Sequence, residues 1–310
     1  MLQLVWDMET GDPDDYLTLL WLLGHPGINL KAVTVTPGSP EQIGVVRHAL
    51  SMFHEDIPVG SFLYDETWAN PQQWKKSEGI RKSHVSKWHY NNFGKIPPSY
   101  DAQPGWQVLH ENCDAETTLL TGGPLRNLGA ALSRSKGDNS IFEVGRLVAQ
   151  GGFAGEGVVP ADKQLEKFKG MTYCPTWNLG GDPHSALMAL SSPEIHSRYF
   201  VSKNVCHGVY YNKSLHALLE PYHQTNPALT VIYNTMTNYL RKKSQGKKFH
   251  DPLAACCAVD PSIATWAEVE LLYVQGKWGS ELADDTQTWI ITDLDHDRFV
   301  DTLFMHNLPE

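Results

Sequence analysis

The sequence predicts an α/β fold with an open, mostly parallel central sheet, helices on both faces and a small antiparallel extension at one edge. Two features of the 310 residues predict it. Short apolar runs typical of buried strands alternate with stretches in which apolar residues repeat at helical spacing. Strands that alternate with helices pair in parallel, and their helices cover both faces of the sheet.

The first half of the chain carries five predicted strands and three predicted helices. The strands are expected at residues 2–8, 30–36, 58–62, 117–120 and 146–150. Helices are expected at residues 15–23 and 40–53 and from about residue 125. The first of these helices is apolar on nearly all sides, whereas Ile43, Val46 and Leu50 repeat at helical spacing in the second.

The last third of the chain is more helical. Helices are expected at residues 227–241, 251–259 and 296–306, and two antiparallel or edge strands at residues 269–274 and 288–292. We find no internal repeat, low-complexity tract or Gly/Ser linker in the sequence. A single domain over residues 1–310 is therefore the simplest expectation.

Residues 63–105 interrupt the alternation of strands and helices. They contain Trp68, Trp74 and Trp88 together with several prolines and glycines and much polar sequence. A segment of this length between regular elements is usually a lid or a binding insertion. The three tryptophans could therefore cover a bound ligand, or they could pack in the core.

Composition argues against several classes of partner. The net charge is −10, and we expect the basic run at residues 241–248 to solvate a helix end rather than bind nucleic acid. No signal-peptide pattern is visible, and the longest apolar helix candidate is too short to cross a bilayer. Five scattered cysteines without a Cys-x-x-Cys pair indicate reduced thiols, so we expect a cytoplasmic protein.

Five carboxylates crowd into the nine residues 7–15 (DMETGDPDD), directly after the first predicted strand. Ligands of open parallel sheets bind at this edge, outside the carboxyl ends of the strands. Like charges so close together repel unless a hard cation such as Ca²⁺ or Mg²⁺ offsets them. Asp14 or Asp15 could instead cap the following helix, but capping does not account for five carboxylates. The spacing differs from an EF-hand loop, and carboxylates would repel a phosphate.

The sequence resembles the inosine–uridine type of nucleoside hydrolase, and the likeness extends in order along nearly the whole chain. Residues 7–15 are similar to the family's Asp-x-Asp-Pro-Gly-x-Asp-Asp motif, and residues 121–128 (TGGPLRNL) to its Thr-Gly-Pro-Leu-Thr-Asn-Leu turn. Further matches are residues 150–152 (QGG), 177–183 (WNLGGDP), 250–254 (HDPLA) and 293–295 (DLD). The resemblance implies the Rossmann-like fold of that family.

The resemblance also implies a bound Ca²⁺ and a set of metal ligands. By position these ligands are Asp15, the main-chain carbonyl of Thr121, Asp251 and a first-loop carboxylate, for which we take Glu9. A divalent cation lowers the pKa of water, and a neighbouring carboxylate accepts the proton. Clustered carboxylates also stabilise the positive charge that develops on a ribose ring when its bond to the base breaks.

The matched positions imply further contacts to a small-molecule nucleoside or nucleotide. Asp14 is expected to bind a ribose hydroxyl, and Asn178 the sugar nearer its 5′ end. His250 is the candidate acid for the leaving base, because histidine titrates near neutral pH, although a packed or capping role is the alternative. Trp177 either stacks on the base or packs, and packing is slightly favoured. Family members form dimers or tetramers, so a homodimer or homotetramer is expected.

The chain departs from the family pattern at several positions. The first motif is one residue longer, so either Glu9 or Asp12 is the catalytic base, and we narrowly prefer Glu9. Ser39 follows Gly38 where the family has Asn, and Thr176 replaces a usual Glu near the sugar. Because the lost carboxylate would repel phosphate, and because Arg126 replaces a threonine, we hypothesise tolerance of a modified or phosphorylated 5′ position.

These features together predict calcium-dependent hydrolysis of the N-glycosidic bond of a ribonucleoside or related nucleotide. One alternative is a nucleoside- or sugar-binding protein that keeps the cation site without turnover. Another is a metal-dependent phosphohydrolase, since an Asp-x-Asp pair after the first strand also serves phosphoryl transfer. Glu9 in place of the second aspartate weakens that last interpretation.

Overall fold

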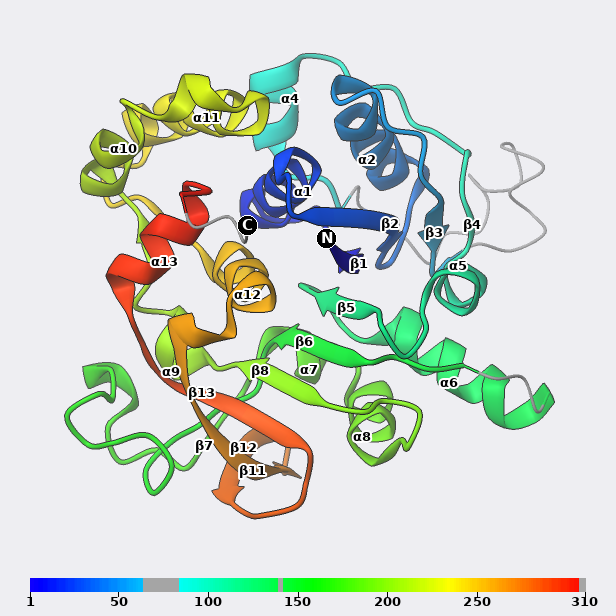
Figure 1. Cartoon of the computed structure of the whole chain (residues 1–310), viewed down its shortest axis with the longest axis vertical. Helices are drawn as coiled ribbons and strands as arrows, with labels where there is room; N and C mark the ends of the chain where they lie inside the picture. Colours follow the sequence, from blue (N-terminus) through cyan, green and yellow to red (C-terminus); the bar gives the residue numbers. More distant parts are fainter. Residues whose placement is uncertain (64–83, 139–141, 307–310) are drawn as a thin grey trace.

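A sheet of eleven strands runs through the chain (Figure 1). The computed structural model describes residues 1–63, 84–138 and 142–306. Eight neighbouring strands are parallel, in the order β4 (Gln103–Pro104), β3 (Val59–Ser61), β2 (Ile28–Val35), β1 (Leu2–Met8), β5 (Thr118–Thr121), β6 (Arg146–Gln150), β8 (Arg198–Val201) and β13 (Thr288–Leu294). The predicted α/β class is confirmed.

An antiparallel extension completes the sheet beyond β13. It consists of β11 (Ala264–Val274), β12 (Lys277–Leu282) and β7 (Tyr173–Cys174). The expected strand at 269–274 is part of β11. The strand expected at 288–292 is β13, which pairs antiparallel with β11, as expected, and also parallel with β8. A separate two-stranded sheet pairs β9 (Tyr210–Tyr211) with β10 (Lys247–Lys248).

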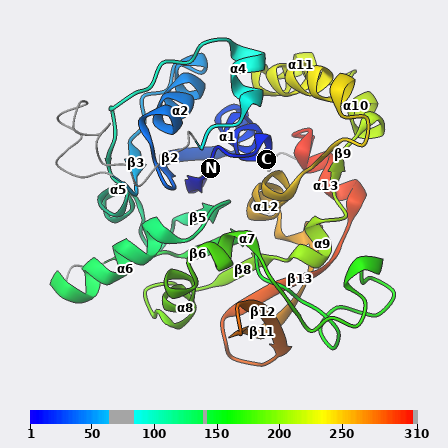
Figure 2. The same cartoon turned by 180° about the vertical axis from the view of Figure 1, so that it is seen from behind.

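Helices cover both faces of the sheet, as Figures 1 and 2 show from opposite sides. One face carries α1 (Pro13–Gly24), α2 (Pro40–Met52), α11 (Pro227–Lys242), α12 (His250–Val259) and α13 (His296–Leu303). The other face carries α5 (Gly105–Asn112), α6 (Arg126–Asp138) and α8 (Pro183–Ser191). Shorter elements are α4 (Lys87–Phe93), α7 (Trp177–Gly181), α9 (Lys203–Cys206), α10 (Lys213–Leu219) and the 3₁₀ turns η2 (Glu166–Phe168), η3 (His223–Thr225) and η4 (Pro261–Ile263).

The two apolar layers follow from the alternation of side chains along each strand. In β1, Leu4 and Trp6 belong to the core cluster shared with α1 and α12, whereas Val5 belongs to the cluster shared with α5 and α6. All of these β1 side chains are fully buried, as a parallel strand covered on both faces requires.

The sequence pattern does not predict β8, and the residue composition of the strand gives the reason. The strand begins with Arg198, a residue that normally indicates an exposed position. Arg198 is nevertheless buried, because its guanidinium donates to the carbonyl oxygens of Ala189 and Ser192 at the end of α8. The last helix also ends three residues earlier than expected, at Leu303.

The tryptophan-rich insertion is only partly described. Trp68 and Trp74 lie outside the described residues, but Trp88 lies in α4 and is buried. Its ring centroid is 6.0 Å from that of Tyr16 and 5.9 Å from that of Phe93. Trp88 therefore packs in the core. Across the described ranges, no helix is long and apolar enough to cross a membrane, and the five cysteines are buried and unpaired.

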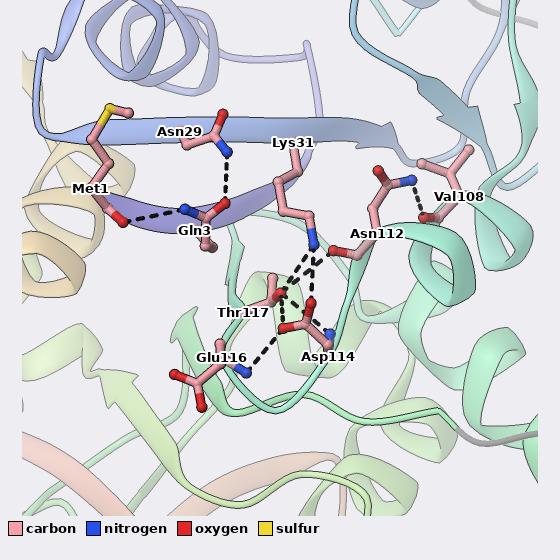
Figure 3. Close-up of polar contacts among 9 residues, drawn as sticks. All are labelled: Met1, Gln3, Asn29, Lys31, Val108, Asn112, Asp114, Glu116 and Thr117. Atoms are coloured by element: carbon pink, nitrogen blue, oxygen red, sulfur yellow. Dashed lines mark hydrogen bonds and ion pairs between the residues drawn. The ribbon is translucent and has the colours of Figure 1, made fainter.

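Polar contacts tie β1, β2 and the loop before β5 together away from the carboxyl ends of these strands (Figure 3). The Lys31 ammonium of β2 lies 3.3 Å from Asp114 Oδ2, and the Asp114 carboxylate accepts a 2.7 Å hydrogen bond from the Thr117 hydroxyl. The Thr117 hydroxyl, followed by smaller effects that include Lys31, lowers the pKa of Asp114. The carboxyl ends of the strands are left for the site described below.

We predict that Asn226→Ala lowers the free energy of unfolding by about 1 kcal/mol. The Asn226 carboxamide oxygen accepts the N–H groups of Ala228 and Leu229 at the start of α11, and its nitrogen donates to the Gly24 carbonyl at the end of α1. Urea denaturation measures the change, with the exposed Gln224→Ala as the control. Equal stability of the two variants would contradict the prediction.

Candidate active site

A cavity of about 500 Å³ opens at the carboxyl ends of β1, β5 and β6. Its walls come from the loop after β1, the first turns of α1 and α12, α7, and the segment at residues 84–86. This volume lies in the range of small-molecule sites. The position is the one expected for a ligand of an open parallel sheet.

Three buried carboxylates from distant parts of the chain converge in this cavity. Asp14 and Asp15 lie in the first turn of α1, and Asp251 lies in the first turn of α12. Their carboxylate oxygens lie within 4.8 Å of one another, and each residue is at most 4% exposed. Burial, followed by the charges of neighbouring carboxylates, raises the pKa of Asp15 and of Asp251 well above the ordinary range.

The surroundings of Asp251 fit a hard cation. Its Oδ1 atom is buried and has no hydrogen-bond partner within the described ranges. A Cβ atom at Gly122 would lie 2.8 Å from that oxygen, so only glycine leaves the space beside it open. Thr121, whose carbonyl the sequence predicts as a ligand, is the last residue of β5 and directly precedes Gly122. Oxygen donors of this kind suit Ca²⁺ or Mg²⁺.

Glu9 is held from two sides at the edge of the cavity. Its backbone N–H donates to Asp15 Oδ1 at 2.9 Å, and its Oε2 accepts the indole N–H of Trp177 at 3.0 Å. Burial raises the pKa of the Glu9 carboxylate, and the Trp177 hydrogen bond partly opposes that effect. Glu9 therefore lies beside the Asp15 carboxylate with its own carboxylate oriented by a hydrogen bond.

Lys247 is a site residue that the sequence interpretation missed. Its side chain is 7% exposed, and its Nζ lies 3.0 Å from Asp14 Oδ1 and 3.1 Å from Asp12 Oδ2. Burial alone would lower the pKa of the ammonium, but the charges of Asp14 and Asp12 outweigh burial and raise it. The interpretation of residues 241–248 as a solvated helix end is wrong at Lys247, because β10 turns this residue inward.

His250 lines the cavity wall next to Asp251. Its backbone N–H donates to Asp14 Oδ2 at 3.3 Å, and its ring stacks on His207 with a centroid separation of 4.8 Å. Burial, and then the positive charges of nearby lysines, lower its pKa to about 3. The lowered pKa favours the neutral imidazole, and the role of His250 toward the leaving base stays a prediction.

The sugar- and base-contact candidates are divided between the cavity and its surroundings. Trp177 is 79% exposed at the cavity edge, so the slightly favoured packing role is wrong for it. Asn178 lines the cavity, and its amide nitrogen donates to Gln150 Oε1 at 2.7 Å and to the Gly122 carbonyl at 2.9 Å. Thr176 is buried at the N-cap position of α7.

Ser39 is outside the cavity lining and is used in a helix cap. Its hydroxyl accepts the Gln42 N–H at 3.3 Å, while Gln42 Oε1 accepts the N–H of Ser39 at 3.0 Å. This reciprocal capping box fixes the start of α2 after Gly38. The structure thus gives the Ser39 hydroxyl a capping contact, and a contact of Ser39 with the sugar stays a prediction.

A second element of the wall, residues 84–86, belongs to the insertion at residues 63–105 that the sequence predicts as a lid or a binding segment. The Thr10 hydroxyl donates to the His84 carbonyl at 3.0 Å, and the Thr10 carbonyl accepts the Ser86 N–H at 3.0 Å. The buried His89 ring also lies 3.2 Å from the Thr10 carbonyl. These contacts anchor the carboxylate-rich loop to the end of the insertion.

Comparisons with known proteins agree with this geometry. A family model described as inosine-uridine preferring nucleoside hydrolase matches residues 4–301. An uncharacterised protein of Aquifex aeolicus (strain VF5) is 28% identical over 303 residues, which cover 94% of this chain and 94% of that protein.

Two solved structures are similar to this chain in fold. A plant nucleoside hydrolase has a TM-score of 0.67 at 18% identity and covers 98% of both chains. The inosine-uridine preferring nucleoside hydrolase of Bacillus anthracis has a TM-score of 0.67 at 19% identity and covers 98% of this chain and 100% of its own.

We predict that Lys247→Met destabilises the metal-free protein by about 3 kcal/mol, because it leaves buried Asp14 without its cationic partner. Urea denaturation in the presence of a chelator measures the change, and the exposed Lys243→Met is the matched control. Excess Ca²⁺ should recover part of the lost stability, since a bound cation offsets the same charge. An unfolding midpoint equal to that of the control would contradict the assignment of Lys247 as the stabilising partner of Asp14.

Proposed function

Because the chain belongs to the inosine-uridine preferring nucleoside hydrolase family, whose members are N-glycosyl hydrolases, we propose that it hydrolyses a ribonucleoside or related nucleotide with the help of Ca²⁺. The observation that carries this proposal is the convergence of Asp14, Asp15 and Asp251 within 4.8 Å in a cavity of about 500 Å³. The products would be the free base and ribose or a ribose derivative.

Asp15, Asp251, the Thr121 carbonyl and Glu9 would hold the cation. Buried carboxylates with raised pKa values and an unpartnered Asp251 oxygen support this assignment. All the donors are oxygen atoms, which favours Ca²⁺ over softer metals. When bound, the ion would supply positive charge that offsets the carboxylates and makes water easier to deprotonate.

Glu9 is the better candidate for the catalytic base. The Asp12 side chain is 61% exposed and forms an ion pair with Lys247, which partly neutralises its charge. Glu9 Oε2 accepts one hydrogen bond from Trp177 and would share its other lone pair with the cation, and the second carboxylate oxygen would accept the proton of the attacking water. The surrounding carboxylates would stabilise the positive charge that develops on the ribose.

The remaining residues would bind the sugar and the base. Asp14 would accept a hydrogen bond from a ribose hydroxyl. Asn178, which donates hydrogen bonds to Gln150 and Gly122, would contact the sugar nearer its 5′ end. Trp177 offers an exposed indole at the cavity edge on which a base can stack. His250 would donate a hydrogen bond to the leaving base from a neutral ring, because its pKa is lowered to about 3.

We predict that the purified protein releases free base from at least one member of a nucleoside and nucleotide panel. A chelator should abolish the release and Ca²⁺ should restore it, which chromatography of the products measures. Asp251→Asn should require at least tenfold more Ca²⁺ for half-maximal activity, because it removes one anionic ligand. Release of inorganic phosphate in place of base would indicate a phosphohydrolase, and binding without any product would indicate a nucleoside-binding protein.

We predict that Glu9→Gln lowers kcat by about 10²- to 10⁴-fold, the usual contribution of a positioned general base. The matched variant Asp12→Asn should lower kcat less than tenfold, because its carboxylate is partly neutralised by Lys247. Steady-state kinetics at saturating Ca²⁺ measures both. The reverse order of the two effects would assign the base to Asp12.

A further inference from the structure

A cluster of positive side chains lies behind one wall of the cavity. We define this basic cluster as Lys167, Lys203, His207 and Lys248, which come from η2, α9, the residue after α9 and β10. The ammonium groups of Lys167 and Lys248 lie 2.7 Å and 3.4 Å from His207 Nδ1. Four residues from three parts of the fold thus bring three formal positive charges to one place.

Among the described residues, the three lysines lack the carboxylate partners that several other lysines have. Lys31, Lys163 and Lys247 form ion pairs with aspartates. For the three lysines of the basic cluster, no carboxylate lies within ion-pair distance in the portion of the chain that the structure describes. In a chain of net charge −10, this concentration of unpaired positive charge favours an anionic ligand.

One stacking contact joins the basic cluster to the cavity lining, and two further contacts involve residues adjacent in sequence to the cluster or to the lining. The His207 ring stacks on His250, which lines the cavity. Gln150 also lines it, and its Nε2 donates to Cys206 Sγ at 3.4 Å, next to His207 in the sequence. Lys203 Nζ donates to the Pro175 carbonyl at 2.7 Å, directly before Thr176.

Thr176 adds an unused polar group beside this contact. Its side chain is 9% exposed, and its hydroxyl has no hydrogen-bond partner among the residues that the structure describes. Trp177 and Asn178 follow it directly and line the cavity. The basic cluster therefore adjoins the wall that carries Gln150, Asn178 and His250.

The same corner offers ligand atoms for a soft metal, but its charge opposes one. Atoms of Cys206, His207 and His250 lie within 4.8 Å of one another. However, burial raises the pKa of the Cys206 thiol to about 12, so it is not an anionic thiolate, and the adjacent lysines would repel a cation. The electrostatics favour an anion over a metal ion.

We propose that the substrate carries a phosphate on the 5′ carbon of its ribose, and that the basic cluster recognises this phosphate. The inference rests on the proposed function, in which the ribose hydroxyls lie at Asp14 and the opposite end of the sugar lies at Asn178. A 5′ substituent then points toward the wall backed by the basic cluster. Lysine ammonium groups on flexible stems can reach a phosphate from behind such a wall and bind it as point charges.

The test compares uridine and inosine with their 5′-monophosphates as substrates, and ribose 5-phosphate with ribose as ligands. We expect kcat/KM at least tenfold higher for the monophosphates, and calorimetry should show at least tenfold tighter binding of ribose 5-phosphate. Lys203→Met and Lys248→Met should each reduce this preference at least tenfold. The exposed Lys277→Met, at the tip of the β11–β12 hairpin, is the matched control and should leave the preference unchanged.

Several outcomes would overturn the inference. One is equal or better use of the unphosphorylated nucleosides, and another is a phosphate preference that survives both lysine variants. Orotidine, whose base carries a carboxylate, is included because its preference over the monophosphates would move the anion site to the base. If no substrate releases its base, the proposed function fails, whereas the binding of ribose 5-phosphate against ribose still decides the inference separately.

Discussion

The site depends on the electrostatic cost of placing Asp14, Asp15 and Asp251 together out of water. Buried carboxylates whose oxygens lie within 4.8 Å repel one another strongly, because little solvent screens them. Lys247 offsets part of this repulsion through Asp14 and Asp12, and a cation beside Asp251 would offset more. The fold supplies the convergence, since α1 begins after β1 and α12 packs directly on α1. In the proposed chemistry, this repulsion between carboxylates favours the binding of a cation.

Much of the fold could be predicted because its signals are local. The strands β1, β2 and β6 and the helices α1, α2 and α11 each carry an apolar period or run that fixes their type. The strand β8 was missed because Arg198 finds carbonyl partners on α8 that the strand itself does not reveal. The pairing of β13 with β8 in parallel likewise depends on which strands become neighbours. The pairing of strands that are distant in sequence has little effect on the local pattern of apolar residues.

The acidic residues of the site could be predicted from motifs, whereas the basic residue Lys247 could not. Asp14, Asp15, Asn178 and Asp251 line the cavity as their motifs suggest. Lys247 sits in a run of basic residues whose composition is typical of a solvated helix end, and only the short β10 strand turns it inward. Glu9 and Asp12 could not be ranked from the sequence, because their difference lies in their partners. Trp177 orients Glu9, and Lys247 neutralises Asp12.

The stacked pair His250 and His207 separates two regions of opposite charge. On one side lie the carboxylates of Asp14 and Asp251, and on the other lie the lysines of the basic cluster. Burial and the neighbouring lysines lower the pKa of both rings, to about 3 for His250 and about 2 for His207, so both are neutral. A neutral pair of rings adds no charge of its own to either side. The two charged regions thus lie on either side of two rings whose centroids are 4.8 Å apart, one region suited to a cation and the other to an anion. A substrate with ribose hydroxyls at one end and a phosphate at the other would match these two regions, because hydroxyls can bind beside a cation and the phosphate is an anion.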